Sequence, residues 1–248
     1  WSVCRKSTEL NGAIEEAEII FGVHLTPASY ARATKLRWIQ SMWAGVEGIL
    51  GASLRAGVIL TKPWGVFGPY LSQYVFGNLL AQKINYLGAL KAQSESKWQP
   101  YRIDLLNGKC LGIAGLGDVA ADTARAARAF GMKVWALNSD GRDNPLADRT
   151  FSSAVKADRV SFVAGLDVLV LTLPKTPSTC GMFNAELLGH LRPESWLINL
   201  GRGALIEDAA LIELLEQKRI AAAVLDVFNE EPLPPDHPYW NLPNCTVT

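Results

Sequence analysis

Short apolar runs alternate along this chain with segments whose apolar residues recur at helical spacing. Strands are predicted at residues 18–23, 36–40, 57–61, 111–114, 132–137, 166–173, 196–200 and 221–227. Helices are predicted at 184–191 and 207–217, and a short helix begins at Thr26-Pro27, where Thr26 suits the N-cap and Pro27 the first helical position. Strands that alternate with helices in this way are typical of a parallel α/β fold.

A break divides the pattern into two units. Residues 62–69 hold two prolines and two glycines, a composition that interrupts regular structure. From Tyr70 to about Lys91 the apolar positions follow a helical period, which predicts one long helix, and the polar residues 93–99 end it. We therefore place a domain boundary near Pro69, with one domain over 1–69 and a second over 70–248.

A glycine-rich turn follows the strand predicted at 111–114. Residues 115–120 read GLGDVA, a form of the dinucleotide-binding motif G-x-G-x-x-A. Gly115 would allow the tight turn, Gly117 would let the backbone approach a pyrophosphate, and Ala120 would let the following helix pack closely. That helix would place Val119, Thr123, Ala127 and Phe130 on one side and end at Gly131. Such glycine turns are common, so the motif gains weight only from the strand and helix around it.

Composition and charge narrow the function classes. Hydrophobic residues make up 49% of the 248 and charged residues 19%, which is a globular profile. The 24 basic and 24 acidic residues cancel, so no global field favours nucleic acid. The longest apolar runs are far too short to span a membrane. The four scattered cysteines form no metal-binding pattern and indicate a reduced, cytoplasmic protein without a metal site. Because the first residue is Trp1, we expect a longer natural chain.

Five motifs together make the chain resemble the D-isomer-specific 2-hydroxyacid dehydrogenases. They are QSMWAGV at 40–46, GLGDVA at 115–120, LTLPKTPST at 171–179, INLGRG at 198–203 and LDVFNEEP at 225–232. The resemblance implies two Rossmann-like α/β domains with parallel sheets and an active site in the cleft between them. The substrate-binding (catalytic) domain over 1–69 would be incomplete at both chain ends, and 70–248 would bind NAD(P). A homodimer through the coenzyme domain is also implied, with the helix at 70–91 and Trp98 contributing.

The resemblance assigns the chemistry to Arg202 and Glu231. Arg202 would hold the carboxylate of a 2-oxo acid and polarise its carbonyl, although a Gly-Arg-Gly loop alone predicts only a solvated side chain. Glu231, directly before Pro232, would orient a catalytic His and raise its pKa; otherwise it is a surface charge. The family's His follows a Thr-Pro whose Thr matches Thr248, so we expect it beyond this sequence. We expect the chain's own histidines, His24, His190 and His237, to be structural or exposed.

The motif at 40–46 supplies the predicted substrate loop, formed by Trp43, Ala44, Gly45 and Val46. Small residues would let backbone N–H groups reach the substrate carboxylate. Trp43 stands where the family has a small residue, so it either lines the cleft and favours an apolar substrate or serves as a core or hinge aromatic.

The choice of coenzyme depends on the end of the strand predicted at 132–137. NAD enzymes place an acidic residue about 20 positions after the turn to bind the ribose hydroxyl. Here Asn138 lies 21 positions after Gly117 (138 − 117 = 21), and Ser139 and Arg142 follow. An uncharged residue with a nearby Arg favours a 2′-phosphate and hence NADP(H) over NAD(H), whereas Asp140 argues the other way. Further coenzyme contacts implied by the resemblance are Gly115, Leu116, Gly117, Asp118, Val119, Leu173, Pro174, Thr179, Leu200, Gly201 and Asp226.

The resulting hypothesis is a reductase that converts a 2-oxo acid into a D-2-hydroxy acid with a hydride from NAD(P)H. Glyoxylate, hydroxypyruvate and longer 2-oxo acids remain open as substrates. The alternative is a dinucleotide-sensing, corepressor-like binding protein, because corepressors with this fold can keep the Arg and the Glu; a relic that only binds coenzyme is a third possibility. Turnover of 2-oxo acids distinguishes the reductase from the other two.

Overall fold

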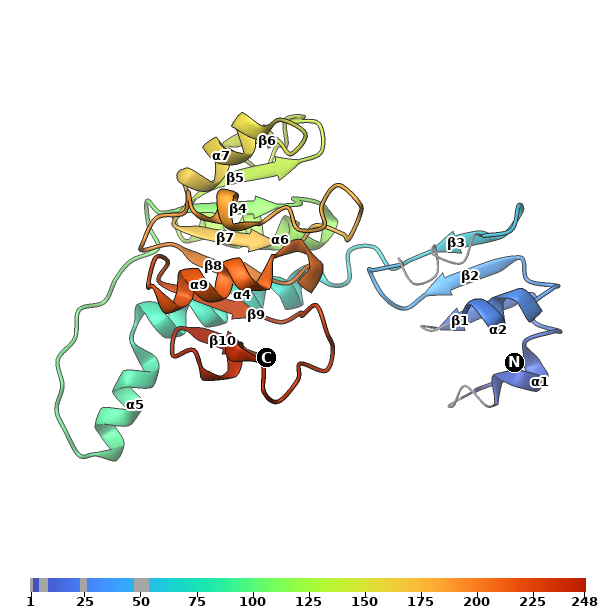
Figure 1. The fold of residues 1–248 in the computed structure, drawn as a ribbon, viewed down its shortest axis with the longest axis horizontal. Helices are drawn as coiled ribbons and strands as arrows, with labels where there is room; N and C mark the ends of the chain where they lie inside the picture. The colour runs from blue at the N-terminus through green and yellow to red at the C-terminus, as the bar shows by residue number, and fades with distance from the viewer. Residues whose placement is uncertain (1, 5–8, 23–25, 47–53) are drawn as a thin grey trace. The chain divides into compact units, whose positions relative to one another are not determined.

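The computed structural model describes residues 2–4, 9–22, 26–46 and 54–248. The chain divides into two compact units, Trp1–Phe67 and Gly68–Thr248, so the second unit begins one residue before Pro69. Each unit contains an entirely parallel sheet with helices packed on it (Figure 1). None of the helices within the described ranges is long and apolar enough to cross a membrane.

The first unit is built on a three-stranded sheet. Its strands, in the order β1-β2-β3, are β1 (Ile19–Gly22), β2 (Trp38–Ser41) and β3 (Ile59–Thr61), and its helices are α1 (Leu10–Ala13) and α2 (Pro27–Arg32). Thr26 caps α2 as predicted, because its Oγ1 accepts a hydrogen bond from the Ser29 N–H at 3.1 Å. The buried side chains of Ile14, Tyr30 and Ile39 form the centre of a small core.

The second unit is built on a seven-stranded sheet in the order β10-β9-β8-β7-β4-β5-β6. Its strands are β4 (Cys110–Ala114), β5 (Lys133–Asn138), β6 (Arg149–Ser152), β7 (Val168–Leu171), β8 (Trp196–Asn199), β9 (Ala222–Leu225) and β10 (Cys245–Val247). The chain moves outward from β4 through β5 to β6, then returns to β7 on the other side of β4. This reversal is the topological switch point at which α/β folds bind their ligands.

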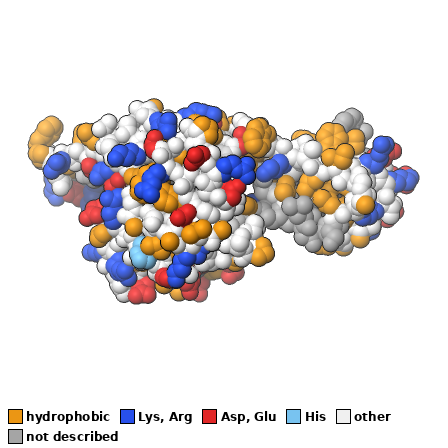
Figure 2. All heavy atoms as spheres, turned by 90° about the horizontal axis from the view of Figure 1, so that it is seen from above, with side chains coloured by type: hydrophobic (Ala, Val, Ile, Leu, Met, Phe, Trp, Pro, Cys, Tyr) orange, Lys and Arg blue, Asp and Glu red, His pale blue; other side chains and the backbone are white. Residues whose placement is uncertain are grey.

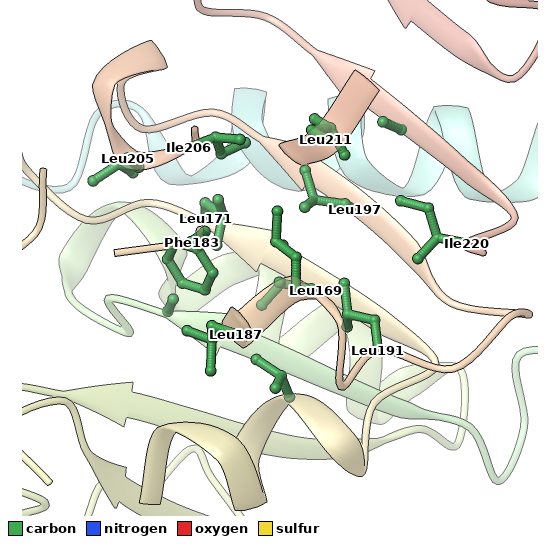
Figure 3. Close-up of a cluster of buried hydrophobic side chains, with 14 of the residues drawn as sticks. Leu169, Leu171, Phe183, Leu187, Leu191, Leu197, Leu205, Ile206, Leu211 and Ile220 are labelled. Carbon is green, nitrogen blue, oxygen red and sulfur yellow. The ribbon is translucent and has the colours of Figure 1, made fainter. Parts of the chain in front are cut away.

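Helices α4 (Gly68–Lys83) and α6 (Asp118–Ala129) cover one face of this sheet, and α7 (Lys156–Ala164), α8 (Ala185–Leu188) and α9 (Asp208–Glu216) cover the other. α5 (Tyr86–Ser94) follows α4, and the 3-10 turns η1 (Gly203–Leu205) and η2 (Pro238–Asn241) precede α9 and β10. Side chains of α4 and α6 share one buried cluster with Ile113, Val170 and Ile198 of the strands. Side chains of α7, α8 and α9 share the other with Leu169 and Leu197 (Figure 3). Because helices cover both faces, the central strands are apolar on both faces and appear in the sequence as continuous apolar runs.

The structure corrects the sequence-based prediction in three places. The helix predicted over 70–91 is two helices, because Asn85 takes a left-handed conformation (φ 47°) between α4 and α5. Phe130, predicted on the same side of its helix as Thr123 and Ala127, follows the last residue of α6, is 40% exposed and stacks on Phe76 with ring centroids 5.0 Å apart. The elements β6, α7 and β10 were not predicted. The predictions for Val23 and His24 concern residues outside the ranges that the structure describes.

Charged side chains of both signs are interspersed on the face drawn in Figure 2, as a net charge of zero leads one to expect.

Four unpaired thiols are present, and burial raises the pKa of Cys110 and of Cys245 to about 12. These two thiols therefore behave as small apolar groups in the second unit.

Candidate functional site

The glycine turn joins β4 to α6 at the switch point. Gly115 has a φ of +97°, and a Cβ there would lie 3.0 Å from the backbone N of Leu173. Its own N–H donates to the Leu137 carbonyl at 2.9 Å. The Thr172 hydroxyl, directly after β7, donates to the carbonyls of Ala114 and Gly115 at 3.1 and 2.9 Å. Backbone conformation and close approach from β7 both require glycine at this position.

The N-terminus of α6 offers an open approach to an anion. Gly117 is the N-cap residue and is exposed, and a Cβ there would meet only the Gly115 carbonyl, at 4.0 Å. Leu116 and Ala120 are buried on either side and anchor the turn. The first N–H groups of a helix carry a partial positive charge and bind phosphates. The turn therefore fits the pyrophosphate of a dinucleotide.

The end of β5 forms a compact loop. The Asn138 amide turns back onto it, accepting from the Gly141 N–H at 2.6 Å and donating to the Arg142 carbonyl at 2.8 Å. The exposed guanidinium of Arg142 pairs with Asp140 at 2.7 Å. Hydrogen bonds from Arg142 lower the pKa of Asp140. Ser139 accepts a hydrogen bond from the Ser152 hydroxyl through its carbonyl. The loop predicted to determine the choice of coenzyme thus contains an exposed Arg that is paired with an acid.

Asn144 is a residue that sequence reasoning missed. Its Nδ2 donates to the Leu116 carbonyl at 3.1 Å and its Oδ1 accepts from the Leu146 N–H at 2.9 Å. It therefore ties the loop after β5 to the glycine turn. The Asn-Pro pair at 144–145 marked a loop, but nothing in the sequence indicated which distant carbonyl the side chain would bind.

The loop after β7 contains Leu173, Pro174 and Thr179, all predicted to contact the coenzyme. Leu173 is buried, whereas Pro174 is exposed. The buried Thr179 hydroxyl donates to the Pro174 carbonyl at 2.7 Å and accepts from the Thr176 N–H at 2.9 Å. These bonds give Thr179 a role in shaping the loop. A coenzyme contact by this loop stays a prediction.

Arg202 follows β8 in a turn that a buried amide holds. Asn199, the last residue of β8, accepts from the Gly201 N–H at 3.1 Å and donates to the Arg202 carbonyl at 3.0 Å. The guanidinium of Arg202 donates to the Gly201 carbonyl at 2.6 Å. A Cβ on Gly201 would lie 2.8 Å from the Leu173 carbonyl, so this turn packs against the loop after β7. Leu200, predicted beside the coenzyme, precedes this turn.

The Glu231 loop packs directly on the Arg202 loop. Glu231 accepts a hydrogen bond from the Phe228 N–H at 2.9 Å. A Cβ on Gly203 would overlap the backbone of Phe228 and Asn229, so only glycine permits this approach. The structure therefore brings together the loops that carry the two predicted catalytic residues, which lie 29 positions apart (231 − 202 = 29).

Asp208 braces the Glu231 loop from α9. Its carboxylate accepts from the Asn229 amide at 2.8 Å and from the Tyr239 hydroxyl at 2.9 Å. Burial, followed by the nearby Asp208 charge, raises the pKa of Tyr239. His237 accepts from the Tyr239 N–H at 3.3 Å and His190 is exposed, so both have the structural or exposed character expected from the sequence.

Asp226 directly follows β9 and lies beside the last residue of the sequence. The Thr248 hydroxyl lies 3.4 Å from Asp226 Oδ1 and 2.6 Å from the hydroxyl of Tyr74 on α4. Burial raises the pKa of Asp226 and of Tyr74, and hydrogen bonds with Thr248 oppose both shifts. No sequence pattern indicated that Tyr74 lies beside Thr248, because 174 positions separate them.

The loop predicted to bind substrate belongs to the first unit. Ser41 Oγ accepts from the Trp43 N–H and donates to the Trp43 carbonyl, both at 3.1 Å. The Lys62 ammonium donates to the Ala44 carbonyl at 3.2 Å. Trp43 is 54% exposed, so it is no core aromatic of this unit. Gly45 and Val46 complete the loop and are half-buried.

Residues 76–248 match the family model of the D-isomer specific 2-hydroxyacid dehydrogenase NAD binding domain. The chain is 33% identical over 225 residues to glyoxylate/hydroxypyruvate reductase A of Serratia proteamaculans (strain 568), an alignment that covers 88% of this chain and 71% of that protein.

Solved structures of proteins from the same family also resemble this chain. A D-isomer specific 2-hydroxyacid dehydrogenase family protein from Aeromonas salmonicida subsp. salmonicida A449 superimposes with a TM-score of 0.88 at 35% identity, covering 99% of this chain and 78% of that one. The NADPH-dependent glyoxylate/hydroxypyruvate reductase of Sinorhizobium meliloti, solved with NADP and sulfate, gives a TM-score of 0.82 at 28% identity and covers 95% and 77%.

Proposed function

Since this chain belongs to the D-isomer specific 2-hydroxyacid dehydrogenase family and is an oxidoreductase, we propose that it reduces a small 2-oxo acid to the D-2-hydroxy acid, with NADPH as the hydride donor. Relatives named glyoxylate/hydroxypyruvate reductase support a substrate of that size. The observation that carries the proposal is the packing of the Arg202 loop on the Glu231 loop through Gly203. Relatives that are reductases favour turnover over the dinucleotide-sensing alternative.

In this proposal the second unit holds the coenzyme. The N–H groups at the start of α6, reached past Gly117, bind the pyrophosphate. When bound, NADPH supplies the hydride that adds to the carbonyl carbon of the substrate. Asp226 and the loops after β7 and β8 lie at the C-terminal edge of the sheet, where they border the nicotinamide.

Arg202 binds the substrate and stabilises the charge that develops on it. Its guanidinium offers a planar fork of donors that matches a carboxylate. Donors aimed at the carbonyl oxygen stabilise the negative charge that forms there during hydride addition, a contribution typically worth several kcal/mol when the donors are preorganised.

Glu231 orients the proton donor. We propose that this donor is a His in the chain that follows Thr248, and that the Glu231 carboxylate holds its imidazole in the charged form by raising its pKa. The His gives its proton to the carbonyl oxygen as the hydride adds to carbon, so the product is a neutral alcohol group. For the first unit we propose the role of the substrate-binding domain, with Trp43, Ala44, Gly45 and Val46 as its substrate loop.

Arg142 supports NADPH rather than NADH. It is exposed in the loop after β5, where a 2′-phosphate would lie, and Asn138 adds no negative charge there. Two relatives with 28% identity were solved with NADP or NADPH. Asp140, which pairs with Arg142, must release it for the phosphate to bind.

The test is a steady-state assay on the full-length protein. NADPH and NADH oxidation are measured against a panel that runs from glyoxylate through hydroxypyruvate to phenylpyruvate. We expect turnover with the small acids, faster with NADPH, and a loss of at least about 100-fold in kcat/KM for Arg202→Ala. Coenzyme binding without turnover of any acid would contradict the reductase and support the dinucleotide-sensing alternative.

We also propose a homodimer formed through the second unit. In Figure 1, α5 projects from the sheet and an extended segment returns to β4. Leu87 is 72% exposed and Trp98 is 95% exposed on this projection, together with Ile103 and Leu105. Exposed apolar side chains of this size favour a protein interface. Light scattering on the protein and on Trp98→Glu should show a dimer and a shift to monomer, and an unmodified monomer would contradict the proposal.

A further inference from the structure

We propose that Asn199 is the positioning residue for Arg202: its buried side-chain amide fixes the turn that aims the guanidinium at the substrate carboxylate. This inference rests on the role proposed for Arg202. None of the coenzyme, substrate or proton-donor roles derived above uses Asn199, although it lies within the INLGRG motif.

Both polar groups of the Asn199 amide bind the backbone of the Arg202 turn. Asn199 is 1% exposed, at the C-terminal end of β8 between Leu171 of β7 and Leu225 of β9. Its Oδ1 accepts from the Gly201 N–H at 3.1 Å, and its Nδ2 donates to the Arg202 carbonyl at 3.0 Å. One side chain thus holds backbone groups on both sides of the Cα of Arg202. The Arg202 backbone is extended (φ −147°, ψ 145°), so no strain is needed to keep it there.

The surroundings limit how far the turn can move in other directions. Gly201 packs on the Leu173 carbonyl on one side, and Gly203 packs on the backbone of Phe228 and Asn229 on the other. These contacts stop the turn from approaching its neighbours, but they do not stop it from lifting away into solvent. The two amide hydrogen bonds oppose that movement. A displacement of about 1 Å at a catalytic group can cost roughly 100-fold in rate.

Asparagine is the side chain whose chemistry suits this position. It offers one acceptor and one donor at the same distance from the backbone. Aspartate has the same shape and can still accept from Gly201, but it would place a carboxylate oxygen against the Arg202 carbonyl oxygen. The carboxylate would also offer the Arg202 guanidinium a competing internal partner. Asn199→Asp therefore removes the positioning bond while it changes volume little.

Ser195 provides the matched control. It lies immediately before β8, is fully buried, and donates from Oγ to the Leu166 carbonyl at 2.8 Å. The same Oγ accepts from the Arg192 N–H at 3.1 Å. Ser195→Ala therefore removes two hydrogen bonds, as many as Asn199 makes, at the other end of the same strand. If Asn199 only stabilised the fold, the two variants would lose stability together and neither would lose activity selectively.

The experiment is a double-mutant cycle on the full-length protein. For Asn199→Asp we expect KM for the 2-oxo acid to rise and kcat to fall, so that kcat/KM drops roughly 10- to 100-fold, while the Kd of NADPH stays within about 2-fold. Ser195→Ala should keep kcat/KM within about 2-fold. In the Arg202→Ala background, Asn199→Asp should cost less than about 2-fold more, because its effect passes through Arg202.

Three results would overturn the inference. Wild-type kcat/KM in Asn199→Asp would do so, as would an equal further loss in the Arg202→Ala background or a parallel loss in Ser195→Ala. If Asn199→Asp does not fold, Asn199→Ser carries the same test, since its short hydroxyl cannot reach both backbone groups. If Arg202→Ala keeps full turnover, the role proposed for Arg202 fails, and the inference with it.

A protein without turnover would contradict the proposed function alone. The inference is then tested by calorimetry, with oxalate as a non-reacting carboxylate and NADP present. A Kd for oxalate that rises roughly tenfold in Asn199→Asp and is unchanged in Ser195→Ala would support it. An unchanged Kd in Asn199→Asp would overturn it.

Discussion

At the scale of single residues, Gly203 is the contact between the two candidate catalytic loops. A Cβ at this position would overlap backbone atoms of Phe228 and Asn229, which cannot move without displacing the Glu231 loop. We predict that Gly203→Ala lowers the free energy of unfolding by about 1–3 kcal/mol and lowers kcat/KM by more than about tenfold. Urea unfolding and steady-state kinetics measure the two effects.

Gly77→Ala is the control for that substitution. Gly77 lies inside α4 and a Cβ there would meet nothing within 4 Å, so alanine should stabilise the helix by about 0.5–1 kcal/mol without changing kinetics. Full activity in Gly203→Ala would contradict the interlocked packing of the two loops.

A second residue-scale prediction concerns Asp140 as the competitor for Arg142. Their ion pair is solvent-exposed, so its removal should leave stability unchanged. Asp140→Asn frees the guanidinium for a 2′-phosphate and should lower KM for NADPH a few-fold while KM for NADH stays the same. Arg142→Ala should raise KM for NADPH only. An equal change in KM for both coenzymes would show that Asp140 and Arg142 do not distinguish the coenzymes by the 2′-phosphate.

Motifs identify residues that carry chemistry more readily than residues that support them. Arg202 and Glu231 were singled out because their motifs are specific. Asn144, Tyr74 and Asp208 were not, because each acts through a contact with a segment far away in the sequence. Such contacts depend on the final packing of loops, which no local pattern encodes.

At the scale of elements, the boundary between α4 and α5 shows where periodicity misleads. The apolar spacing over 70–91 is compatible with one continuous helix, yet Asn85 turns left-handed and starts a new one. Its amide packs over Gly88, where any Cβ would collide with it. Asparagine tolerates the left-handed region better than most residues, but this tolerance does not by itself predict a break.

The elements β6 and α7 were missed because one is a four-residue strand, RTFS, with little apolar pattern, and the other follows it closely.

Asn85 supports an element-scale prediction. Asn85→Ala should lower the free energy of unfolding by about 1 kcal/mol, because the Cβ of alanine crowds the following carbonyl oxygen in the left-handed conformation. Asn85→Gly should be neutral or slightly stabilising, since glycine adopts this conformation without a Cβ. The exposed Gln82→Ala, in the regular part of α4, serves as control and should change stability by less than about 0.5 kcal/mol. Equal stability of the alanine and glycine variants at 85, measured by urea unfolding, would contradict the strain argument.

At the scale of the whole molecule, the parallel α/β class was predictable because the central strands of the second sheet, β4, β7, β8 and β9, are short and buried on both faces. The order of the strands was not predictable from their pattern alone and depended on the resemblance. The glycine turn carried the most information, since it fixes which strand lies at the switch point. The structure places that turn next to β7 through Gly115 and Thr172, as the fold requires.

The division into two units leads to the last prediction. Both large buried clusters of the second unit consist of its own side chains, on the two faces of its own sheet. We therefore expect a fragment of residues 68–248 to unfold cooperatively and to bind NADPH with a Kd within about 3-fold of the full-length value, but to show no turnover without Trp43–Val46. Residues 1–67, whose small core surrounds Ile14, Tyr30 and Ile39, should be at most marginally stable alone, because a chain of that length buries only about 60% of the surface that it exposes when unfolded. Calorimetry and coenzyme fluorescence test both fragments. A 68–248 fragment that folds but does not bind NADPH would place part of the coenzyme site in the first unit and would overturn the assignment of roles to the two units.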